Sequence, residues 1–335
     1  FVAFFPTLVA GPILRASDFL PQLNEKISNL KSQIKLKQFF INNRNLKLGI
    51  TMMAIGFLKK LFFADNIAPM VDNVFNSPIG HESFTIILGT IGFGFQVYGD
   101  FSGYSDIAIG AALIIGINVP PNFRKPFFST SPSDFWRRWH ISLSTWVRDY
   151  LYFPLIFKNR KSSQRLFSSL FTSFFLLGLW HGAGWNFIIF GIIHGIYVAV
   201  DTLVRKQFPN FSKNKFFKTK IGKITSILIT QFLIFFAFIS FRVRDVDEMV
   251  YSMKKYLIWD FEIDGTINFI QQNEFAVILI PIFLILQIIT LKIKNVSERI
   301  SSLQVKHWLI FLTIIMLLVV LFYRGSAEEF IYFEF

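Results

Sequence analysis

Two histidines stand beside tryptophans in short polar segments of an otherwise apolar sequence. His140 lies in SDFWRRWHIS and His181 in LLGLWHGAGWNF, and a third, His194, follows in FGIIHGIY. An ionisable side chain at membrane depth is costly unless protein buries it or water reaches it, so such residues mark functional sites. Imidazole is the side chain that most often transfers protons in catalysis near neutral pH. The histidines therefore predict a catalytic site.

The composition indicates that the elements holding these histidines are membrane helices. Hydrophobic residues make up 53% of the 335 residues, and phenylalanine alone occurs 44 times. A soluble domain of this size would be less apolar. Because a helix satisfies its own backbone hydrogen bonds in lipid, we expect an all-α, polytopic membrane protein.

Charge and motif content exclude several classes of function. The net charge of +13 does not indicate nucleic acid as a partner, because the basic residues lie in short blocks between apolar runs, as cytoplasmic loops do. Without cysteine, this chain cannot carry a thioester-linked acyl group. It contains no GxSxG elbow, P-loop, HExxH motif or clustered metal-ligand pattern, so hydrolase and ATPase activities lose support and no metal site is expected.

Apolar runs near twenty residues long predict the membrane helices. We expect them at about 46–64, 84–98, 104–118, 166–180, 185–204, 224–241, 275–291 and 308–323, with the tail of another at 1–10. Because Phe1 already lies in an apolar stretch, further helices are expected before it. We expect one membrane domain over 1–335. Its basic loops are expected in the cytoplasm, namely 15–47, Lys158–Arg165, Arg205–Lys223 and Lys292–Lys306. The charges do not decide the topology of residues 99–157.

The position of His181 in this scheme follows from helix length. A helix over 166–180 rises about 22 Å, which is less than the roughly 30 Å of hydrocarbon. His181 is thus expected below the outer surface, at the Gly182–Gly184 turn of a helical hairpin. Irregular backbone at this depth must pack in protein or line a cavity, so a water-reachable funnel is expected.

Two interpretations remain open for the segment around His140. A continuous helix over 135–151 would align Arg137, His140, Ser144 and Arg148 on one face. That helix either lies in the membrane interface, or its polar face lines a channel where Arg137, Arg138 and Arg148 hold the phosphates of an acyl donor. The pattern does not choose between them.

Other polar positions also have two interpretations. His194, Tyr197 and Asp201 share a helix face, so His194 either forms a hydrogen bond within the core or orients a partner. The polar stretch from Asp100 to Asp106 is either a channel wall or a break between two helices.

Several longer segments carry a family resemblance. They are FFPTLVAGPILR, FQVYGDFSGYSDIAIG, NFRKPFFSTSPSDFWRRWHISLSTWVRDYLYFPL, GLWHGAGWNFIIFGIIHG and the terminal FIYFEF. In this order they resemble the membrane-bound O-acyltransferase family, nearly end to end, and most closely its bacterial alginate O-acetyltransferase branch. The D-alanyl transfer proteins of teichoic acid modification are more distant relatives.

This resemblance implies a ring of tilted helices around a central funnel and tunnel. It implies transfer of an acyl group from a cytoplasmic thioester, acetyl-CoA or another, to a hydroxyl outside, with no bound cofactor. His181 of the WHG motif matches the principal catalytic histidine, and His140 of the RWH motif a second functional position. We expect His181 to act as general base, and His140 or Asn186 to donate to the oxyanion.

The expected partners follow from the same branch. They are the lipid bilayer of the bacterial inner membrane, an extracytoplasmic acetyltransferase or acyl-acceptor protein, and a polysaccharide acceptor. Transfer of D-alanyl or another acyl group to a wall polymer is an alternative. A polysaccharide or lipid transporter is the alternative from another class, with the same polar residues lining its pathway.

Overall fold

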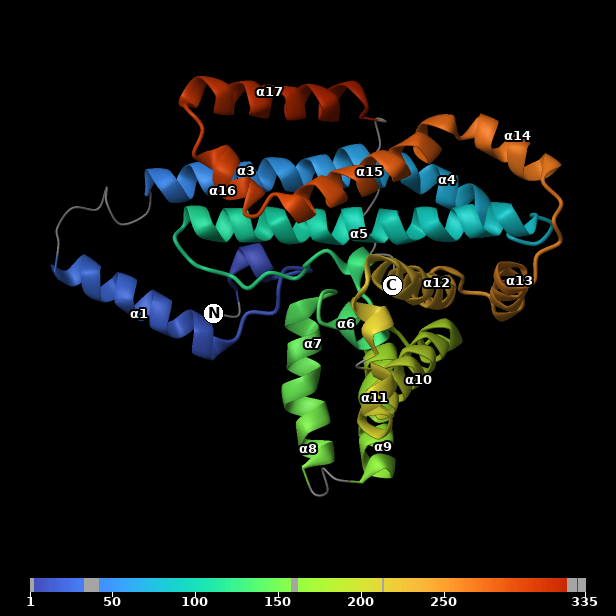
Figure 1. The fold of residues 1–335 in the computed structure, drawn as a ribbon. Helices are drawn as coiled ribbons and strands as arrows, with labels where there is room; N and C mark the ends of the chain where they lie inside the picture. The colour runs from blue at the N-terminus through green and yellow to red at the C-terminus, as the bar shows by residue number, and fades with distance from the viewer. Residues whose placement is uncertain (1–2, 33–41, 158–161, 213, 324–329, 331–335) are drawn as a thin grey trace. The chain divides into compact units, whose positions relative to one another are not determined.

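The computed structural model describes residues 3–32, 42–157, 162–212, 214–323 and 330, and these form helices and no strand (Figure 1). The all-α, polytopic prediction is confirmed. In chain order the elements are η1 (Phe5–Thr7), α1 (Ala16–Ser32), α3 (Asn43–Phe57), η2 (Leu58–Ala64), α4 (Asp65–Phe75), α5 (Ser83–Ile114), η3 (Pro126–Phe128), α6 (Pro132–Trp136), α7 (Ile141–Val147), η4 (Arg148–Tyr152), α8 (Phe153–Ile156), α9 (Ser163–His181), α10 (Trp185–Gln207), α11 (Pro209–Ser212), η5 (Lys215–Lys218), α12 (Lys220–Arg242), α13 (Val246–Leu257), α14 (Asp264–Gln272), α15 (Glu274–Lys292), α16 (Val296–Ser301) and α17 (Val305–Leu321).

The chain divides into two compact units. The first comprises Phe1–Ala68, Phe95–Asn122 and Ile278–Glu334, and the second comprises Pro69–Gly94 and Phe123–Val277. All of the predicted site residues belong to the second unit. The expectation of one membrane domain and of a helix ring around a funnel stays a prediction.

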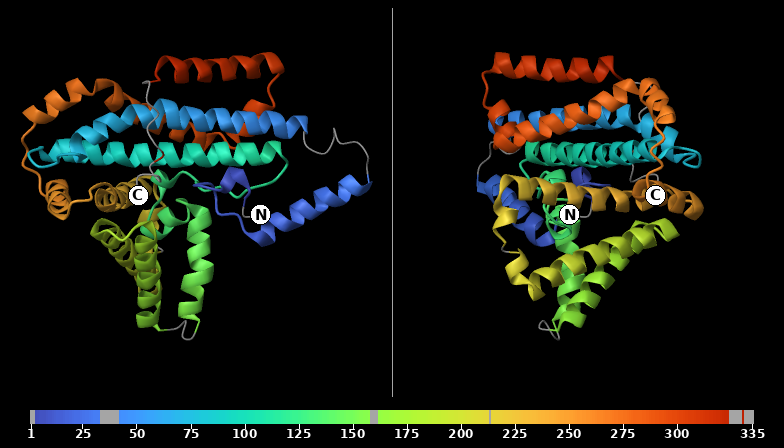
Figure 2. Two further views of the ribbon diagram at one scale, coloured as in Figure 1. Left: turned by 180° about the vertical axis from the view of Figure 1, so that it is seen from behind. Right: turned by 45° about the vertical axis from the view of Figure 1, so that its right-hand side comes forward.

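In the first unit, α3 runs beside the C-terminal part of α5 because glycines line their contact (Figure 2). A Cβ atom on Gly49 would lie 2.6 Å from the carbonyl oxygen of Gly110, and one on Gly56 would lie 2.6 Å from that of Gly103. Small residues allow two backbones to approach in this way in membrane proteins. The contact therefore depends on the absence of side chains at these positions.

The helix break expected between 98 and 104 is wrong, because α5 is continuous from Ser83 to Ile114. Its carboxylates are paired with lysines of the π-helical segment η2. Lys60 Nζ lies 2.7 Å from Asp100 and 2.8 Å from Asp65, and Lys59 Nζ lies 2.6 Å from Asp106. Paired charges can be buried within a helix bundle, so the polar stretch needs no break in the helix.

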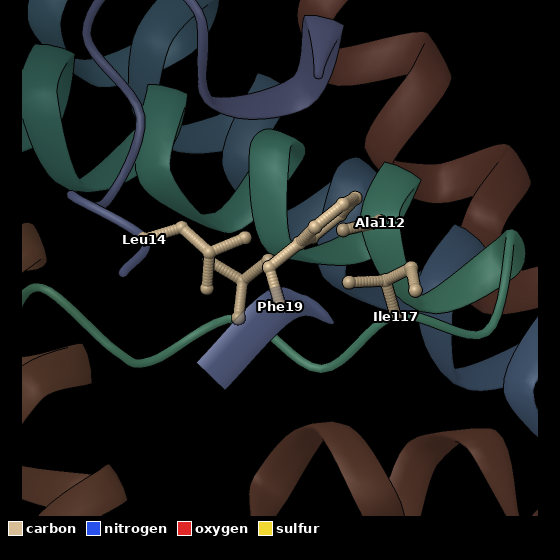
Figure 3. Close-up of a cluster of buried hydrophobic side chains, with 5 residues drawn as sticks. Leu14, Phe19, Ala112 and Ile117 are labelled. Carbon is tan, nitrogen blue, oxygen red and sulfur yellow. The ribbon is translucent and has the colours of Figure 1, made fainter. Parts of the chain in front are cut away.

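Two predictions for the N-terminal segment are wrong. Within residues 3–10 the chain forms only the short η1, and Pro6 with the nearby Gly11 does not favour a longer helix. The stretch predicted as a basic loop begins with a helix, α1, whose Phe19 packs with Leu14, Ala112 and Ile117 (Figure 3). This apolar contact packs α1 against the C-terminal end of α5.

Several long apolar helices agree with the predicted spans. Among the described residues, α10, α12 and α15 are long and apolar enough to cross a membrane, and α17 is a shorter apolar helix. They match the helices predicted at 185–204, 224–241, 275–291 and 308–323. The number of membrane crossings stays a prediction.

Candidate active site

His181 is the last residue of α9, and the chain reverses directly after it. Gly182 follows the helix, and α10 begins at Trp185, so the predicted hairpin turn over Gly182–Gly184 is confirmed. The helix is longer than the predicted 166–180, because it begins at Ser163. At about 1.5 Å per residue it rises about 28 Å, so the argument from a short helix does not hold. The depth of His181 stays a prediction.

The imidazole of His181 is half-buried among aromatic rings. Its ring centroid lies 5.1 Å from that of Phe241, 6.0 Å from Phe190 and 6.3 Å from Phe187. The flanking Trp180 and Trp185, in contrast, are exposed. One side of the histidine therefore faces packed protein, while the turn that follows it is accessible.

His140 does not lie within a helix, which corrects the continuous helix predicted over 135–151. Helix α6 ends at Trp136, and α7 begins at Ile141 with His140 as its N-cap. The backbone of His140 is left-handed, with φ 41° and ψ 56°, and its side chain is only 4% exposed. The shared face predicted for Arg137, His140, Ser144 and Arg148 is consequently wrong.

The break before His140 has a structural cause. The backbone amide of Arg124 donates to the carbonyl of Arg138 at 2.9 Å, and Ser144 Oγ donates to that of Trp139 at 3.1 Å. A continuous helix would use these carbonyls for its own hydrogen bonds. The ring of Trp139 is buried and stacks on Phe135, with centroids 5.4 Å apart.

The three arginines expected at a donor site are exposed to different extents. Arg137 is the most exposed and lies 3.9 Å from Asp134, while Arg138 makes a closer ion pair with Asp134 at 3.0 Å. Arg148 pairs with Asp149 at 2.8 Å. These ion pairs are on the surface, where they contribute little to stability.

His194 is fully buried on α10 and forms a hydrogen bond in the core. The indole Nε1 of Trp136 donates to its Nδ1 at 3.2 Å, and the Phe190 ring packs at 4.5 Å. The prediction that His194 forms a hydrogen bond within the core is thus confirmed. Sequence reasoning missed Trp136 as its partner, because the two residues are far apart in the chain.

The fold brings the three histidines together from separate segments. All three belong to the second unit. Phe190 packs against His181 and His194. Near the same hairpin turn, Asn186 is only 3% exposed, and its amide nitrogen makes no hydrogen bond within the described part of the chain. The site thus holds imidazoles, which can carry protons, and a buried hydrogen-bond donor.

The described residues contain no group of three or more histidine, cysteine, aspartate or glutamate side chains that could hold a metal ion.

Comparison with known proteins gives one family and several curated relatives. A model of the membrane-bound O-acyltransferase family matches residues 1–243. A peptidoglycan O-acetyltransferase of Helicobacter pylori is 37% identical over 76% of this chain and 45% of its own length. A probable alginate O-acetylase of Azotobacter vinelandii is 42% identical over 61% of this chain and 38% of its own length.

A teichoic acid D-alanyltransferase of Bacillus subtilis is also similar, at 32% identity over 72% of this chain and 60% of its own length. The chain therefore spans about half the length, or less, of the first two relatives. All three names describe acyl transfer, and the resemblance to the alginate O-acetylase branch is confirmed.

Proposed function

This chain belongs to the membrane-bound O-acyltransferase family, and from that premise we propose that it transfers an acetyl group from a cytoplasmic thioester toward hydroxyls of an extracytoplasmic polysaccharide. The observation that carries this proposal is the packing of His181 among aromatic rings beside the hairpin turn, in the same unit as His140. The donor is acetyl-CoA or another acyl thioester. The enzyme acts in the bacterial inner membrane, and a partner protein outside completes the transfer to the polymer.

In this proposal His181 acts as the general base. A hydroxyl is a poor nucleophile at neutral pH, and a neutral imidazole accepts its proton as its oxygen attacks the thioester carbonyl. The carbon–sulfur bond then breaks, and the departing thiolate takes the proton from the imidazolium. The ester forms, and His181 returns to its neutral form. The residue is suited to this cycle because packed rings hold it beside an accessible turn.

The oxyanion that forms during this attack needs hydrogen-bond donors. Asn186 supplies a buried amide nitrogen without a partner in the described residues, two positions after the turn that follows His181. His140 is the second donor, held by a backbone that only tight surroundings maintain. Donors arranged before the reaction stabilise a developing charge strongly in a site that excludes water.

The exposed arginines are assigned to the donor. A guanidinium forms two parallel hydrogen bonds with a phosphate, and Arg137 and Arg148 are exposed enough to do so. Arg138 supports Arg137 through their shared partner, Asp134.

Transfer of D-alanyl to a wall polymer is the second candidate. The similarity to the Bacillus subtilis D-alanyltransferase favours it, whereas the higher identity to the alginate O-acetylase favours acetyl. The site chemistry is the same in both, because each donor is an acyl thioester. Membership in an acyltransferase family leaves the transporter alternative without support.

The test uses labelled acyl transfer in membranes that contain the full-length protein. His181→Ala should lower transfer by at least about 100-fold at equal membrane abundance, because general-base catalysis contributes 10²–10⁴-fold. His307→Ala, an exposed histidine in the other unit, is the matched control and should retain the activity. Mass spectrometry of the acceptor identifies the acyl group. Normal ester content in the His181 variant would contradict the proposal.

A further inference from the structure

One face of α10 holds the short helix that precedes His140. Trp136 Nε1, at the end of α6, donates to His194 Nδ1, and the amide of Ser133, near its start, donates to Asp201 at 3.2 Å. His194 and Asp201 are two helical turns apart on α10 and so lie on the same face. Helix α6 is thus attached to α10 at both of its ends.

The hydrogen bond from Trp136 also determines where the His194 proton lies. An indole nitrogen can only donate, so Nδ1 must be the acceptor, and the neutral ring carries its proton on Nε2. A protonated ring would place two N–H groups against each other. Trp136 therefore selects the neutral form and one tautomer of His194.

Packing alone does not account for a histidine at this position. Its neighbours are the rings of Phe135, Phe190 and Tyr197, and its Nε2 makes no hydrogen bond with any described residue. A phenylalanine would fill this space without the unsatisfied Nε2, but it would leave the buried indole N–H of Trp136 without its acceptor. What histidine adds is the acceptor for Trp136.

The hydrogen bond between Trp136 and His194 connects the segments that carry His140 and His181. Trp136 lies four residues before His140, and the intervening turn ends in the left-handed backbone of His140. Such a conformation persists only where the surroundings impose it. His194 lies on α10, which forms a hairpin with α9, the helix that carries His181. The ring of Phe190 packs against both histidine rings.

We propose that His194 is a positioning residue, which holds His140 in place relative to His181 by accepting the hydrogen bond of Trp136. This inference rests on the proposed acyl transfer, and it adds a residue that acts through another and not on the reactants. A small displacement of a catalytic group lowers the rate of the chemical step more than it lowers binding of the donor.

Three substitutions separate this role from packing. Asparagine places its amide oxygen where His194 has Nδ1, whereas glutamine reaches the position of Nε2, and phenylalanine supplies the ring alone. In membranes that contain the full-length enzyme, His194→Asn should retain most of kcat. His194→Gln and His194→Phe should lower kcat roughly tenfold to a hundredfold, with the donor KM unchanged.

A second experiment tests whether His194 acts through Trp136. Trp136→Phe should lower kcat as much as His194→Phe, and the double variant should lose no more than either single variant. Thr85→Val is the control, because it removes another buried side-chain hydrogen bond of the same unit, to Thr266 at 2.9 Å. It should leave kcat unchanged at equal membrane abundance.

The outcomes are distinct. The positioning role would be overturned if the asparagine and phenylalanine variants lost equal activity, or if all three variants kept their activity. It would also be overturned if only the glutamine variant kept its activity, or if the losses from His194→Phe and Trp136→Phe were additive. If the unaltered full-length protein transfers no acyl group, the proposed function fails and this role fails with it. Transfer that depends on His181 but not on His194 overturns this role alone.

Discussion

At the scale of single residues, Glu82 shows how one carboxylate holds the first turn of a helix in the second unit. It accepts hydrogen bonds from the amide of Gly265 at 2.8 Å, the amide of Thr266 at 2.7 Å and the hydroxyl of Thr266 at 2.7 Å. These groups lie in the first turn of α14, where a negative charge also interacts favourably with the helix dipole. The hydrogen bond from the Thr266 hydroxyl, followed by those from the two amides, lowers the pKa of Glu82.

This lowered pKa predicts a loss of stability in acid. The folded protein binds the Glu82 proton less tightly than the unfolded chain does, so its contribution is complete above the ordinary glutamate pKa of about 4.3. The contribution disappears as the pH falls through the lowered folded value. The melting temperature in detergent should therefore be lower for Glu82→Gln than for the unaltered protein at pH 7, and the difference should shrink below pH 4.

The exposed Glu262, just before α14, provides the control. Glu262→Gln should leave the melting temperature close to that of the unaltered protein at pH 7. A difference between the Glu82 variant and the unaltered protein that stays constant from pH 7 to pH 3.5 would show that the charge of Glu82 is not what stabilises α14.

At the scale of elements, the hairpin of α9 and α10 depends on two glycines at its contact. A Cβ atom on Gly178 would lie 2.9 Å from the Cα of Gly191 and closer still to the carbonyl oxygen of Phe187, and one on Gly191 would lie 2.7 Å from the carbonyl oxygen of Phe174. These neighbours are backbone atoms, which cannot rotate away. The hairpin that carries His181 and His194 therefore has no room for a side chain there.

Adding one methyl group should separate these helices. Gly178→Ala and Gly191→Ala should each destabilise the protein by about 1–3 kcal/mol, as overpacked cores do, and lower acyl transfer by displacing His181. Gly195→Ala in the same helix should cost less, because its nearest neighbours, atoms of Phe171, are 3.3 Å away. Thermal unfolding in detergent and the transfer assay measure both effects. Equal stability of all three variants would contradict the packing argument.

At the scale of the whole molecule, the orientation of the chain in the membrane decides which side of it the reaction faces. The basic blocks Lys158–Arg165 and Arg205–Lys223 flank α9 and α10, and positively charged loops remain in the cytoplasm. Both ends of the hairpin are therefore expected inside, with the Gly182–Gly184 turn toward the outside.

Single-cysteine labelling tests this orientation, since the chain contains no cysteine. Ser163→Cys should react with an impermeant thiol reagent only after the cytoplasmic side has been opened. Ala183→Cys should react from outside in intact cells. Ala183 is exposed and is a better site than Gly184, where a Cβ atom would clash with the side chain of Asn186. If Ser163→Cys were labelled from outside, the hairpin would have the opposite orientation, and the acceptor could not bind at the Gly182–Gly184 turn from the outside.

The sequence by itself determined the features that depend on neighbouring residues. Long apolar runs predicted α10, α12, α15 and α17, because burial in lipid requires about twenty apolar residues in succession. Glycines after His181 predicted the hairpin turn, and the order of the longer motifs indicated the family. Each of these signals is local in the chain.

The tertiary structure alone decided what depends on distant partners. Lysines of η2 keep α5 continuous through Asp100 and Asp106, and the contacts of Trp136 and Trp139 accompany the break before His140. Helical periodicity could place polar residues on a face, but it could not show which distant groups would satisfy them. A buried polar group must find a partner, and folding, not spacing along the chain, determines which partner it finds.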